Sequence, residues 1–417
     1  MQAYQGSDQG WWLGSDALSR VVADLIRTEA RRLRPGAAVP PSGPWAPGTR
    51  LDEAGLGFDS LERLHLAAAL SELLNIREGG PGDELLARPV FGEWCAIAAE
   101  RLGRFSATLS FRSSGTLGAP KSCPHALSEL EREIDALLEI LSGGHTRVLA
   151  AVPSHHIYGL LFTVLLPQRL GGVPVVDIRA HSPGALPGLA RRGDLVAGYP
   201  EFWAAALRAA PWPWPAGVIG VTSTAPCPEE TADGLMAGKL SRLLQIHGSS
   251  ETAGIGWRDD PRGPYSLLPY WDRGTDDRLI RAPLPGTGAA PIAVMAPDKL
   301  EWLDQRRYHI GARHDGAVQV GGMNVSTSKV RNVLQEHPDV AAVAVRLMIP
   351  SEGRRLKAFI VPKTAGGDIE ALRKGLDAWS ATRLSVPEQP RAYTIGTVLP
   401  TDPMGKMADW TIISDPL

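Results

Sequence analysis

The chain has 417 residues, of which 44% are hydrophobic and 21% charged, and its formal net charge is −2. This length predicts two or three domains, and the near-neutral charge gives no basic footprint for nucleic acid. No apolar run approaches the roughly 20 residues that a membrane span needs. No secretory leader is visible, and the three cysteines are widely scattered, which favours a reducing compartment. We therefore expect a cytoplasmic protein without nucleic-acid or membrane partners.

The first part of the chain is expected to be helical. After a flexible segment of residues 1–16, apolar residues recur at helical spacing toward Leu33. Further on, Asp59 precedes Glu62 by three residues, which predicts a capping box at the start of another helix. Ser60 therefore lies in the first turn of that helix, where unpaired N–H groups and the helix dipole favour a negative phosphate.

The segment around Ser60 resembles the acyl and peptidyl carrier proteins, in which the serine of a Gly-x-Asp-Ser-Leu-type motif receives a phosphopantetheine arm. Residues 50–101 carry ten acidic and five basic side chains, and the resulting net charge of −5 suits a carrier that docks on basic partners. The resemblance implies a four-helix carrier domain over residues 17–102, loaded on Ser60 by a phosphopantetheinyl transferase. The alternative is that Ser60 only caps its helix.

From Arg104 onward, short apolar strands alternate with amphipathic helices. Strands are expected at 104–111, 147–152, 172–178, 194–198, 217–222 and 241–246. The clearest helix is at 125–142, and a Pro- and Gly-rich stretch at 260–289 is expected to be irregular. This alternation predicts a parallel sheet covered on both faces, with ligands beyond the carboxyl ends of its strands.

After two adjacent glycines, Gly321 and Gly322, the pattern changes to a smaller α/β unit. Helices are expected at 327–336 and 368–383, and strands at 339–346, 356–362 and 392–398. About a hundred residues are enough for a separate domain. The sequence therefore predicts a distinct C-terminal domain.

A loop rich in glycine and hydroxyl groups follows the first expected strand. It runs from Ser113 to Lys121 and reads Ser-Ser-Gly-Thr-Leu-Gly-Ala-Pro-Lys. Glycines let backbone N–H groups converge on an anion, the hydroxyls add donors, and Lys121 adds a point charge. The loop lacks the Walker A spacing, and on its own such a loop is as often a plain surface connection.

Three more segments carry chemistry at expected loop positions. In His247-Gly-Ser-Ser-Glu251-Thr-Ala-Gly, a carboxylate beside hydroxyls and glycines suits a magnesium–phosphate site, although Glu251 could instead cap a helix. Arg313 and Asp315 precede an alternating strand and the paired glycines. Lys406 follows Gly405 in a loop near the C-terminus, and its simpler interpretation is a solvated lysine.

In this order and spacing, the four segments resemble the ANL superfamily of adenylate-forming enzymes, which includes acyl- and aryl-CoA synthetases and the adenylation domains of nonribosomal synthetases. The resemblance covers roughly residues 104–410. It implies an α/β fold with an abbreviated large domain as adenylation core (residues 103–314), and a small, mobile C-terminal α+β lid domain (residues 315–417). The carrier-like segment takes the place of the long subdomain that normally precedes the phosphate loop in this family.

The resemblance also implies roles for individual residues. Lys406 would be the catalytic lysine, His156 would lie near the acid carboxylate, and Glu251 would bind Mg²⁺; the alternative for His156 is a core histidine. Asp315 would be the domain hinge. The implied ATP- and AMP-binding residues are Ser113, Ser114, Gly115, Thr116, Gly118 and Lys121 in the phosphate loop, Thr224, Ala225 and Pro226 on the adenine side, His247, Gly248, Ser249 and Ser250, and Asp298 and Arg313 at the ribose. Residues that line the acid pocket, or alternatively the core, are Tyr158, Tyr199, Trp203 and Thr252.

We therefore expect ATP- and Mg²⁺-dependent activation of a carboxylic acid, a small aryl or acyl acid, as acyl-AMP with release of pyrophosphate. A phosphopantetheine thiol, on Ser60 of the same chain or on a separate carrier protein, would then accept the acyl group for a downstream synthase. Two alternatives remain open. One is an acyl- or aryl-CoA ligase with a vestigial carrier domain, and the other is a non-catalytic carrier or scaffold with a ligase remnant.

Overall fold

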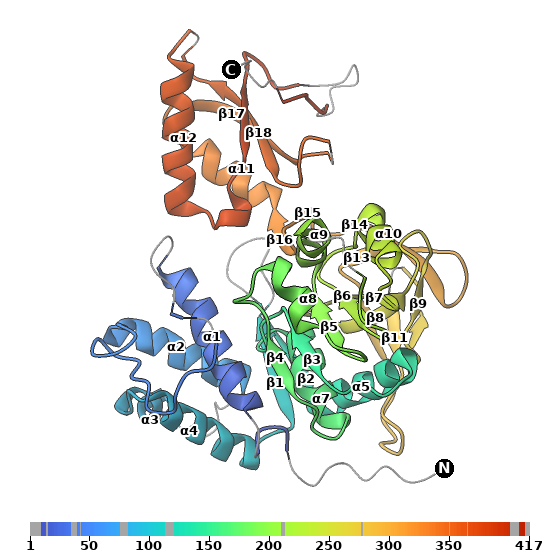
Figure 1. Ribbon diagram of the computed structural model, residues 1–417. Coiled ribbons are helices and arrows are strands. Elements are labelled where there is room, and N and C mark those ends of the chain that lie inside the picture. Colours follow the sequence, from blue (N-terminus) through green and yellow to red (C-terminus); the bar gives the residue numbers. More distant parts are fainter. Residues whose placement is uncertain are drawn as a thin grey trace. The chain divides into compact units, whose positions relative to one another are not determined.

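The computed structural model describes residues 10–13, 16–34, 40–41, 43–75, 82–112, 121–209, 213–276, 278–349, 351–364, 366–400 and 408–412. The chain divides into two compact units (Figure 1). The large unit comprises residues 1–113 and 121–311, and the C-terminal unit comprises residues 114–120 and 312–417. Within the described ranges, no helix is both long enough and apolar enough to cross a bilayer.

The large unit is built on a nine-stranded sheet with the strand order β13-β14-β9-β8-β7-β6-β5-β3-β4. Its strands are β3 (Val148–Ala150), β4 (Val175–Asp177), β5 (Leu195–Gly198), β6 (Ile219–Thr222), β7 (Arg242–Ser249), β8 (Ala253–Arg258), β9 (Tyr265–Leu267), β13 (Asp298–Trp302) and β14 (Arg307–Arg313). Five neighbouring strands of this sheet, β4, β3, β5, β6 and β7, run parallel to one another, as the sequence predicts. Strands β8 and β9 are antiparallel to their neighbours because the chain turns back directly after β7.

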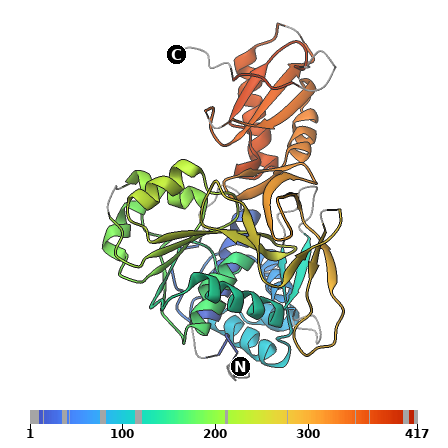
Figure 2. The ribbon, with the colours of Figure 1, turned by 90° about the vertical axis from the view of Figure 1, so that its right-hand side faces the viewer.

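Both faces of this sheet are covered, which confirms the expected layering (Figure 2). Val148 and Leu195 belong to a hydrophobic cluster shared with helix α5, whereas their neighbours Leu149 and Val196 belong to a second cluster shared with α8, α9 and α10. Successive side chains of a strand point to opposite faces, so this division follows from the pleat. The helices are α5 (Leu127–Leu141), α6 (Ile157–Leu160), η1 (Leu161–Leu165), α7 (Leu166–Arg169), η2 (Pro183–Ala185), α8 (Leu186–Leu189), α9 (Pro200–Ala209) and α10 (Glu229–Ala237).

Two smaller sheets complete the large unit. Strands β1 (Thr108–Arg112) and β2 (Ser122–Ala126) pair antiparallel, with Arg112 opposite Ser122. Strands β10 (Trp271–Arg273), β11 (Arg278–Arg281) and β12 (Ile292–Met295) form an antiparallel sheet. The expectation of irregular structure over 260–289 is therefore wrong, since β9, β10 and β11 lie in that range.

The N-terminal helices share one core with the main sheet. They are α1 (Ala17–Leu33), α2 (Ser60–Leu73), α3 (Gly82–Ala87) and α4 (Phe91–Arg104). Ile26 of α1, Leu70 of α2 and Trp94 of α4 lie in the same contiguous hydrophobic cluster as Leu244 of β7. An independent carrier bundle over 17–102 would bury a core of its own, so the four-helix carrier interpretation is not confirmed.

The capping box predicted at the start of α2 is confirmed. The Glu62 backbone N–H donates to Asp59 Oδ1 at 2.8 Å, and the Asp59 N–H donates to Glu62 Oε2 at 2.9 Å. These two bonds satisfy N–H groups that the helix itself leaves without partners. Ser60 is the first residue of the helix, and its side chain is exposed.

The C-terminal unit has a core of its own. Its elements are β15 (Ala317–Val320), β16 (Met323–Ser326), α11 (Thr327–Gln335), β17 (Val340–Leu347), β18 (Leu356–Pro362), α12 (Ile369–Arg383), η3 (Val386–Glu388) and β19 (Ala392–Ile395). Strand β18 pairs antiparallel with β17 and parallel with β19. Val330, Leu334, Ile360 and Leu376 are buried in one cluster that contains only residues of this unit. The expected order of elements is confirmed.

Candidate active site

The carboxyl ends of the parallel strands are joined at one edge of the sheet. The Tyr158 hydroxyl, on the segment after β3, donates to the carbonyls of Gly198 (2.9 Å) and Val221 (3.0 Å), at the ends of β5 and β6. Ser223 Oγ, just after β6, donates to the Ile246 carbonyl of β7 at 2.9 Å. These bonds bring the segments after β3, β5, β6 and β7 together, which is where ligands bind in open α/β sheets.

The residues expected on the adenine and acid sides lie in these segments. His156 is the N-cap of α6, and its side chain is exposed. Thr224 lies in the left-handed region at φ 77°, and it is exposed, as is Pro226, while Ala225 is partly buried. A threonine rarely adopts this backbone conformation, and such strain is concentrated at functional sites.

The turn after β7 presents Glu251 to the surface. Ser249 Oγ accepts hydrogen bonds from the backbone N–H groups of Glu251 and Thr252, both at 3.2 Å. His125 of β2 contacts the Ser250 carbonyl at 2.7 Å through Nε2. Because a carbonyl only accepts, Nε2 carries the proton, and burial lowers the pKa of His125 so that the ring is neutral. The turn is thus fixed while the Glu251 side chain stays exposed.

A buried carboxyl group supports this turn from behind. Both oxygens of Glu133, on α5, contact the Gly254 backbone N–H, at 3.0 and 3.1 Å. Burial raises the pKa of Glu133 to about 7. A Cβ on Gly254 would lie 2.3 Å from Glu133 Oε1, so the close approach requires glycine. A small cavity beside these groups is lined by His125, Glu129, Leu130, Glu133, Thr252, Ala253, Tyr270 and Arg281.

Asp298, expected at the ribose, is partly buried and forms a hydrogen-bonded chain with the buried side chains of His247 and Tyr308. His247 Nε2 lies 3.1 Å from Asp298 Oδ2, and His247 Nδ1 lies 2.8 Å from the Tyr308 hydroxyl. An ionised carboxylate only accepts, so Nε2 donates to Asp298 and Nδ1 accepts from Tyr308. Burial raises the pKa of Tyr308 well above its ordinary value, which keeps its proton in place. His247 therefore orients Asp298.

Arg313, the last residue of β14, and Asp315, two residues further on, bind each other. Arg313 Nε and Nη2 donate to the two oxygens of Asp315 at 2.9 and 2.8 Å, and Asp315 Oδ1 also accepts from the Ala317 N–H at 3.0 Å. This bidentate pair fixes the chain where it leaves β14. The ribose role expected for Arg313 and the hinge role expected for Asp315 remain predictions.

Part of the expected site lies outside the described residues. This holds for the five expected phosphate-loop residues from Ser113 to Gly118 and for Lys406. Lys121 is described; it directly precedes β2 and is exposed. Strands β1 and β2 pair with Arg112 opposite Ser122, so the two described residues that flank the phosphate loop lie opposite each other.

The expected pocket aromatics differ in their surroundings. Trp203 is fully buried in the cluster that the sheet shares with α8, α9 and α10. Of the two interpretations left open for this residue, acid pocket or core, its position matches the core. Tyr158 is buried at the joined strand ends. Tyr199, directly after β5, is only partly buried, and burial raises the pKa of its hydroxyl.

The Glu251 carboxylate fits a magnesium ion that is shared with a nucleotide. Within the described ranges, no three His, Cys, Asp or Glu side chains cluster as a metal cage. Mg²⁺ in nucleotide sites is usually held by one or two carboxylates together with phosphate oxygens. A single exposed carboxylate at a turn beside hydroxyl groups matches that donor set.

Sequence reasoning missed His125, Glu133 and Tyr308. The available signals were weak: His125 stands at the start of the expected helix 125–142, although the structure places it on β2, Glu133 lies within a charged stretch of that helix, and Tyr308 opens the segment that contains Arg313. None of these patterns reveals which backbone group a side chain will meet.

Comparison with known proteins gives three kinds of match. A family model described as AMP-binding enzyme C-terminal domain matches residues 329–406. A 4-coumarate–CoA ligase from Rhodobacter capsulatus is 36% identical over 400 residues, covering 94% of this chain and 99% of that protein. One from Halorhodospira halophila is 37% identical over 396 residues, covering 95% and 99%. An amide bond synthetase structure from Marinactinospora thermotolerans has a similar fold, with a TM-score of 0.56, 17% identity and coverage of 94% and 92%.

The match to the Rhodobacter protein includes most of the N-terminal helices. The 6% of this chain outside it corresponds to about 25 of 417 residues, fewer than the span 17–102. These helices therefore correspond to part of a protein that is named a ligase. This agrees with the shared hydrophobic core and gives no support to an added carrier domain.

Proposed function

Because the chain belongs to the ANL superfamily of adenylate-forming enzymes, as an AMP-forming acid–thiol ligase, we propose that it makes the CoA thioester of a small aromatic acid. The observation that carries this proposal is the hydrogen-bonded edge where the segments after β3, β5, β6 and β7 meet. The choice of acid is supported by the two relatives described above, which are named 4-coumarate–CoA ligases.

In the proposed first step, an oxygen of the acid carboxylate attacks the α-phosphorus of ATP, and the bond from that phosphorus to pyrophosphate breaks. The difficulty is repulsion between an anionic attacker and an anionic triphosphate. Lys121 and Lys406 reduce that repulsion by placing positive charge at the phosphates and the carboxylate. His156 contacts the acid carboxylate and orients it. Bound magnesium, held by Glu251, would neutralise part of the phosphate charge.

The nucleotide is held by segments on both sides of this reacting centre. We assign its phosphates to Ser113, Ser114, Gly115, Thr116 and Gly118 with Ser249 and Ser250, and its adenine to Thr224–Pro226 with Gly248. Asp298, oriented by His247, accepts hydrogen bonds from the ribose, which Arg313 also reaches. The hydrogen bond from His247 would keep the Asp298 carboxylate oriented before the nucleotide arrives.

In the second step, the CoA thiol attacks the acyl carbon of the adenylate. A C–S bond forms, the bond from that carbon to the AMP oxygen breaks, and the thiol proton is released. We propose that the C-terminal domain, residues 315–417, acts as a lid that turns about Asp315 between the two steps and withdraws Lys406. The adenylation core is then residues 103–314 together with the helices that share its core.

CoA is the proposed thiol instead of a carrier-bound arm. The transfer to a carrier that the sequence suggested is not confirmed, because the N-terminal helices belong to the core of the large unit. Ser60 lies inside a complete capping box, between Asp59 and Glu62, whose contacts account for the local sequence. A phosphopantetheine on Ser60 has no support beyond the motif.

The test is a product assay with ATP, Mg²⁺ and a panel of aryl and aliphatic acids, with and without CoA. We expect AMP and an acyl-CoA to form in equal amounts with hydroxycinnamate-type acids, and no thioester without CoA. Lys406→Ala serves as the control that abolishes adenylation. AMP formation that does not depend on any acid of the panel would contradict the proposal.

A further inference from the structure

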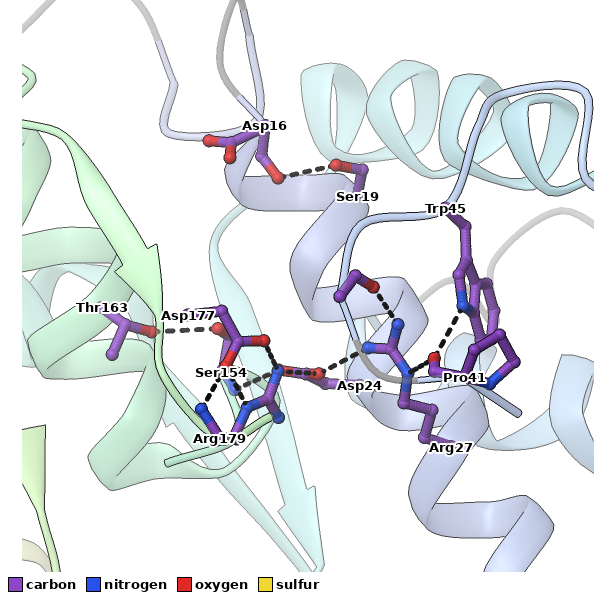
Figure 3. A network of polar contacts seen from close by, with 11 residues as sticks. Asp16, Ser19, Asp24, Arg27, Pro41, Trp45, Ser154, Thr163, Asp177 and Arg179 are labelled. Carbon is purple, nitrogen blue, oxygen red and sulfur yellow. Dashed lines mark hydrogen bonds and ion pairs between the residues drawn. The ribbon is translucent and has the colours of Figure 1, made fainter. Parts of the chain in front are cut away.

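A fully buried aspartate on α1 contacts the segment that carries His156 (Figure 3). The Asp24 side chain is 0% exposed. Its Oδ2 accepts a hydrogen bond from the Ser154 backbone N–H at 2.7 Å, and its Oδ1 accepts from Arg179 Nη2 at 2.7 Å and from Arg27 Nη1 at 3.1 Å. Ser154 lies two residues before His156. The N-terminal helix is thus bonded directly to the acid side of the proposed site.

The charges around Asp24 balance. Arg179 also donates through Nε to Asp177 at 2.9 Å, and Arg27 donates to the Pro41 carbonyl at 2.8 Å. Two aspartates and two arginines therefore form one closed network, which Figure 3 shows between α1 and the sheet. A buried carboxylate persists only when it is paired and hydrogen-bonded in this way.

The segment that Asp24 holds is tight and well connected. Ser154 Oγ accepts a hydrogen bond from Thr163 Oγ1 at 3.0 Å. A Cβ on Gly159 would lie 1.9 Å from the Pro153 carbonyl oxygen, so α6 packs closely against the backbone at Pro153 and requires glycine at this position. A shift of Ser154 would therefore move His156 with it.

The rings of His155 and His156 are not held by hydrogen bonds of their own among the described residues. His155 is buried, and burial, with His156 and Arg179 nearby, holds its pKa well below the usual value, so its ring is neutral. The two ring centroids are 4.1 Å apart. The His156 ring thus rests on a neutral ring, and its position depends on the backbone that Asp24 anchors.

We propose that Asp24 is a positioning residue for acid activation, because its bond to the Ser154 N–H places His156 against the acid carboxylate. This rests on the role of His156 in the proposed function. Glu29 of the same helix is also buried, and it pairs with Arg112, the last residue of β1, at 3.1 Å. Helix α1 therefore braces both the acid side and the end of strand β1, which precedes the phosphate loop.

The test compares Asp24→Ala with Asp24→Asn in acid-dependent ATP–pyrophosphate exchange. Alanine removes the acceptor of the Ser154 N–H, whereas the asparagine oxygen retains it. We expect kcat/KM for the acid to fall about 10- to 100-fold in Asp24→Ala, with KM for ATP changed less than about twofold. In Asp24→Asn, kcat/KM for the acid should fall clearly less. Asp135→Ala, which breaks the partly exposed pair with Arg169, is the matched control and should leave both constants unchanged.

Three outcomes would overturn the inference: wild-type kinetics in Asp24→Ala, equal changes in the acid and ATP constants, or no advantage of asparagine over alanine. If Asp24→Ala fails to fold, the near-isosteric Asp24→Asn decides, because it weakens the pairing with Arg179 and Arg27 that holds the side chain. A larger rise in KM for the acid than in KM for ATP then supports the inference, and any other result overturns it. His156→Ala separates the inference from the proposed function. Impairment in His156→Ala without impairment in Asp24→Ala contradicts only the positioning role, whereas no acid-dependent exchange in the wild type contradicts the function itself.

Discussion

The helices before the main sheet and the unit after it differ in where they bury their apolar side chains. Helices α1, α2 and α4 place theirs in the cluster that also contains the β-strands of the large unit. The C-terminal unit places its own in a separate cluster formed only by residues 318–395. The first region is therefore part of a larger fold, and the second has the core of an independent domain.

Buried charges show the same difference. In the N-terminal region, Asp24 and Glu29 of α1 pair with Arg179 and Arg112, which lie far away in the sequence. In the C-terminal unit, the buried Lys357 binds Glu352 at 2.8 Å and other groups of the same unit. The apolar face of an amphipathic helix can thus be recognised in the sequence. Which region of the protein the helix packs against is shown by the partners of its buried charges in the structure.

The largest expected effect is a loss of stability that distinguishes the two regions. Leu70→Ala leaves a cavity in the core shared by α2 and the sheet, and we expect a cost of about 3 kcal/mol in unfolding free energy. Hydrogen exchange should then accelerate in β5, β6 and β7 as well as in α1. Leu376→Ala is the matched control in the C-terminal unit and should accelerate exchange only within residues 312–412. Acceleration confined to α1–α4 in Leu70→Ala would mean that these helices form a domain of their own.

The two units are also expected to respond oppositely to pH. Glu133 has its pKa raised to about 7 by burial, so its contribution to the stability of the large unit is fully present below pH 4.5 and is lost as pH rises through 7. Between these two pH values, the contribution of Glu133 to the unfolding free energy changes by at most about 3 kcal/mol. Glu388 of the C-terminal unit has a lowered pKa; burial opposes this, but the bonds from Lys329 and Ser385 outweigh it. Its contribution is present above pH 4.5 and is lost on acidification.

Urea unfolding between pH 4.5 and 7.5 measures this contrast. Glu133→Gln keeps an acceptor for the Gly254 N–H but cannot ionise, so it should remove the decline in the stability of the large unit between pH 5 and 7. Glu388→Gln is the control for the other unit. A stability of the large unit that declines equally in wild type and Glu133→Gln would show that Glu133 does not titrate as described.

A smaller effect is expected at the capping box of α2. Asp59→Ala removes the acceptor of the Glu62 N–H and should cost about 1 kcal/mol in the unfolding free energy of the large unit. Asp59→Asn retains a side-chain oxygen and should cost only a fraction of that. Equal losses in the two variants would argue against the cap as the source of stability.

The smallest effect is expected at Ser60. Ser60→Ala changes an exposed side chain, and the Asp59–Glu62 bonds of the cap remain. The unfolding free energy should therefore change by less than about 0.5 kcal/mol. The rate of CoA-thioester formation should stay within about twofold of wild type. Mass spectrometry after incubation with CoA and a phosphopantetheinyl transferase should show no added mass on the wild-type chain. Loss of thioester formation in Ser60→Ala would restore the carrier interpretation.

Much of the fold could be predicted because its signals are local. The alternation of strands and helices, the capping box at Asp59 and the order of elements after Gly322 depend on residues close in sequence. The antiparallel continuation after β7 could not be predicted, because the turn at residues 250–252 carries no sign of the direction in which the chain continues.

The site could be predicted only in part, for a similar reason. Loops at strand ends converge by topology, so the segments around His156, Thr224 and Glu251 could be grouped from the sequence alone. The supporting residues could not be. Glu133 lies in a charged stretch typical of a solvated helix face, and Asp24 on an ordinary amphipathic helix. Their roles depend on backbone N–H groups more than a hundred residues away.

The most direct measurement of the central claim is ATP–pyrophosphate exchange with hydroxycinnamate-type acids in wild type, Glu251→Gln and Lys406→Ala. If the strand-end segments form one adenylating site, exchange requires an acid in the wild type and falls by at least about 100-fold in both variants. Exchange that persists in Glu251→Gln at the wild-type rate, or that needs no acid, would contradict the account.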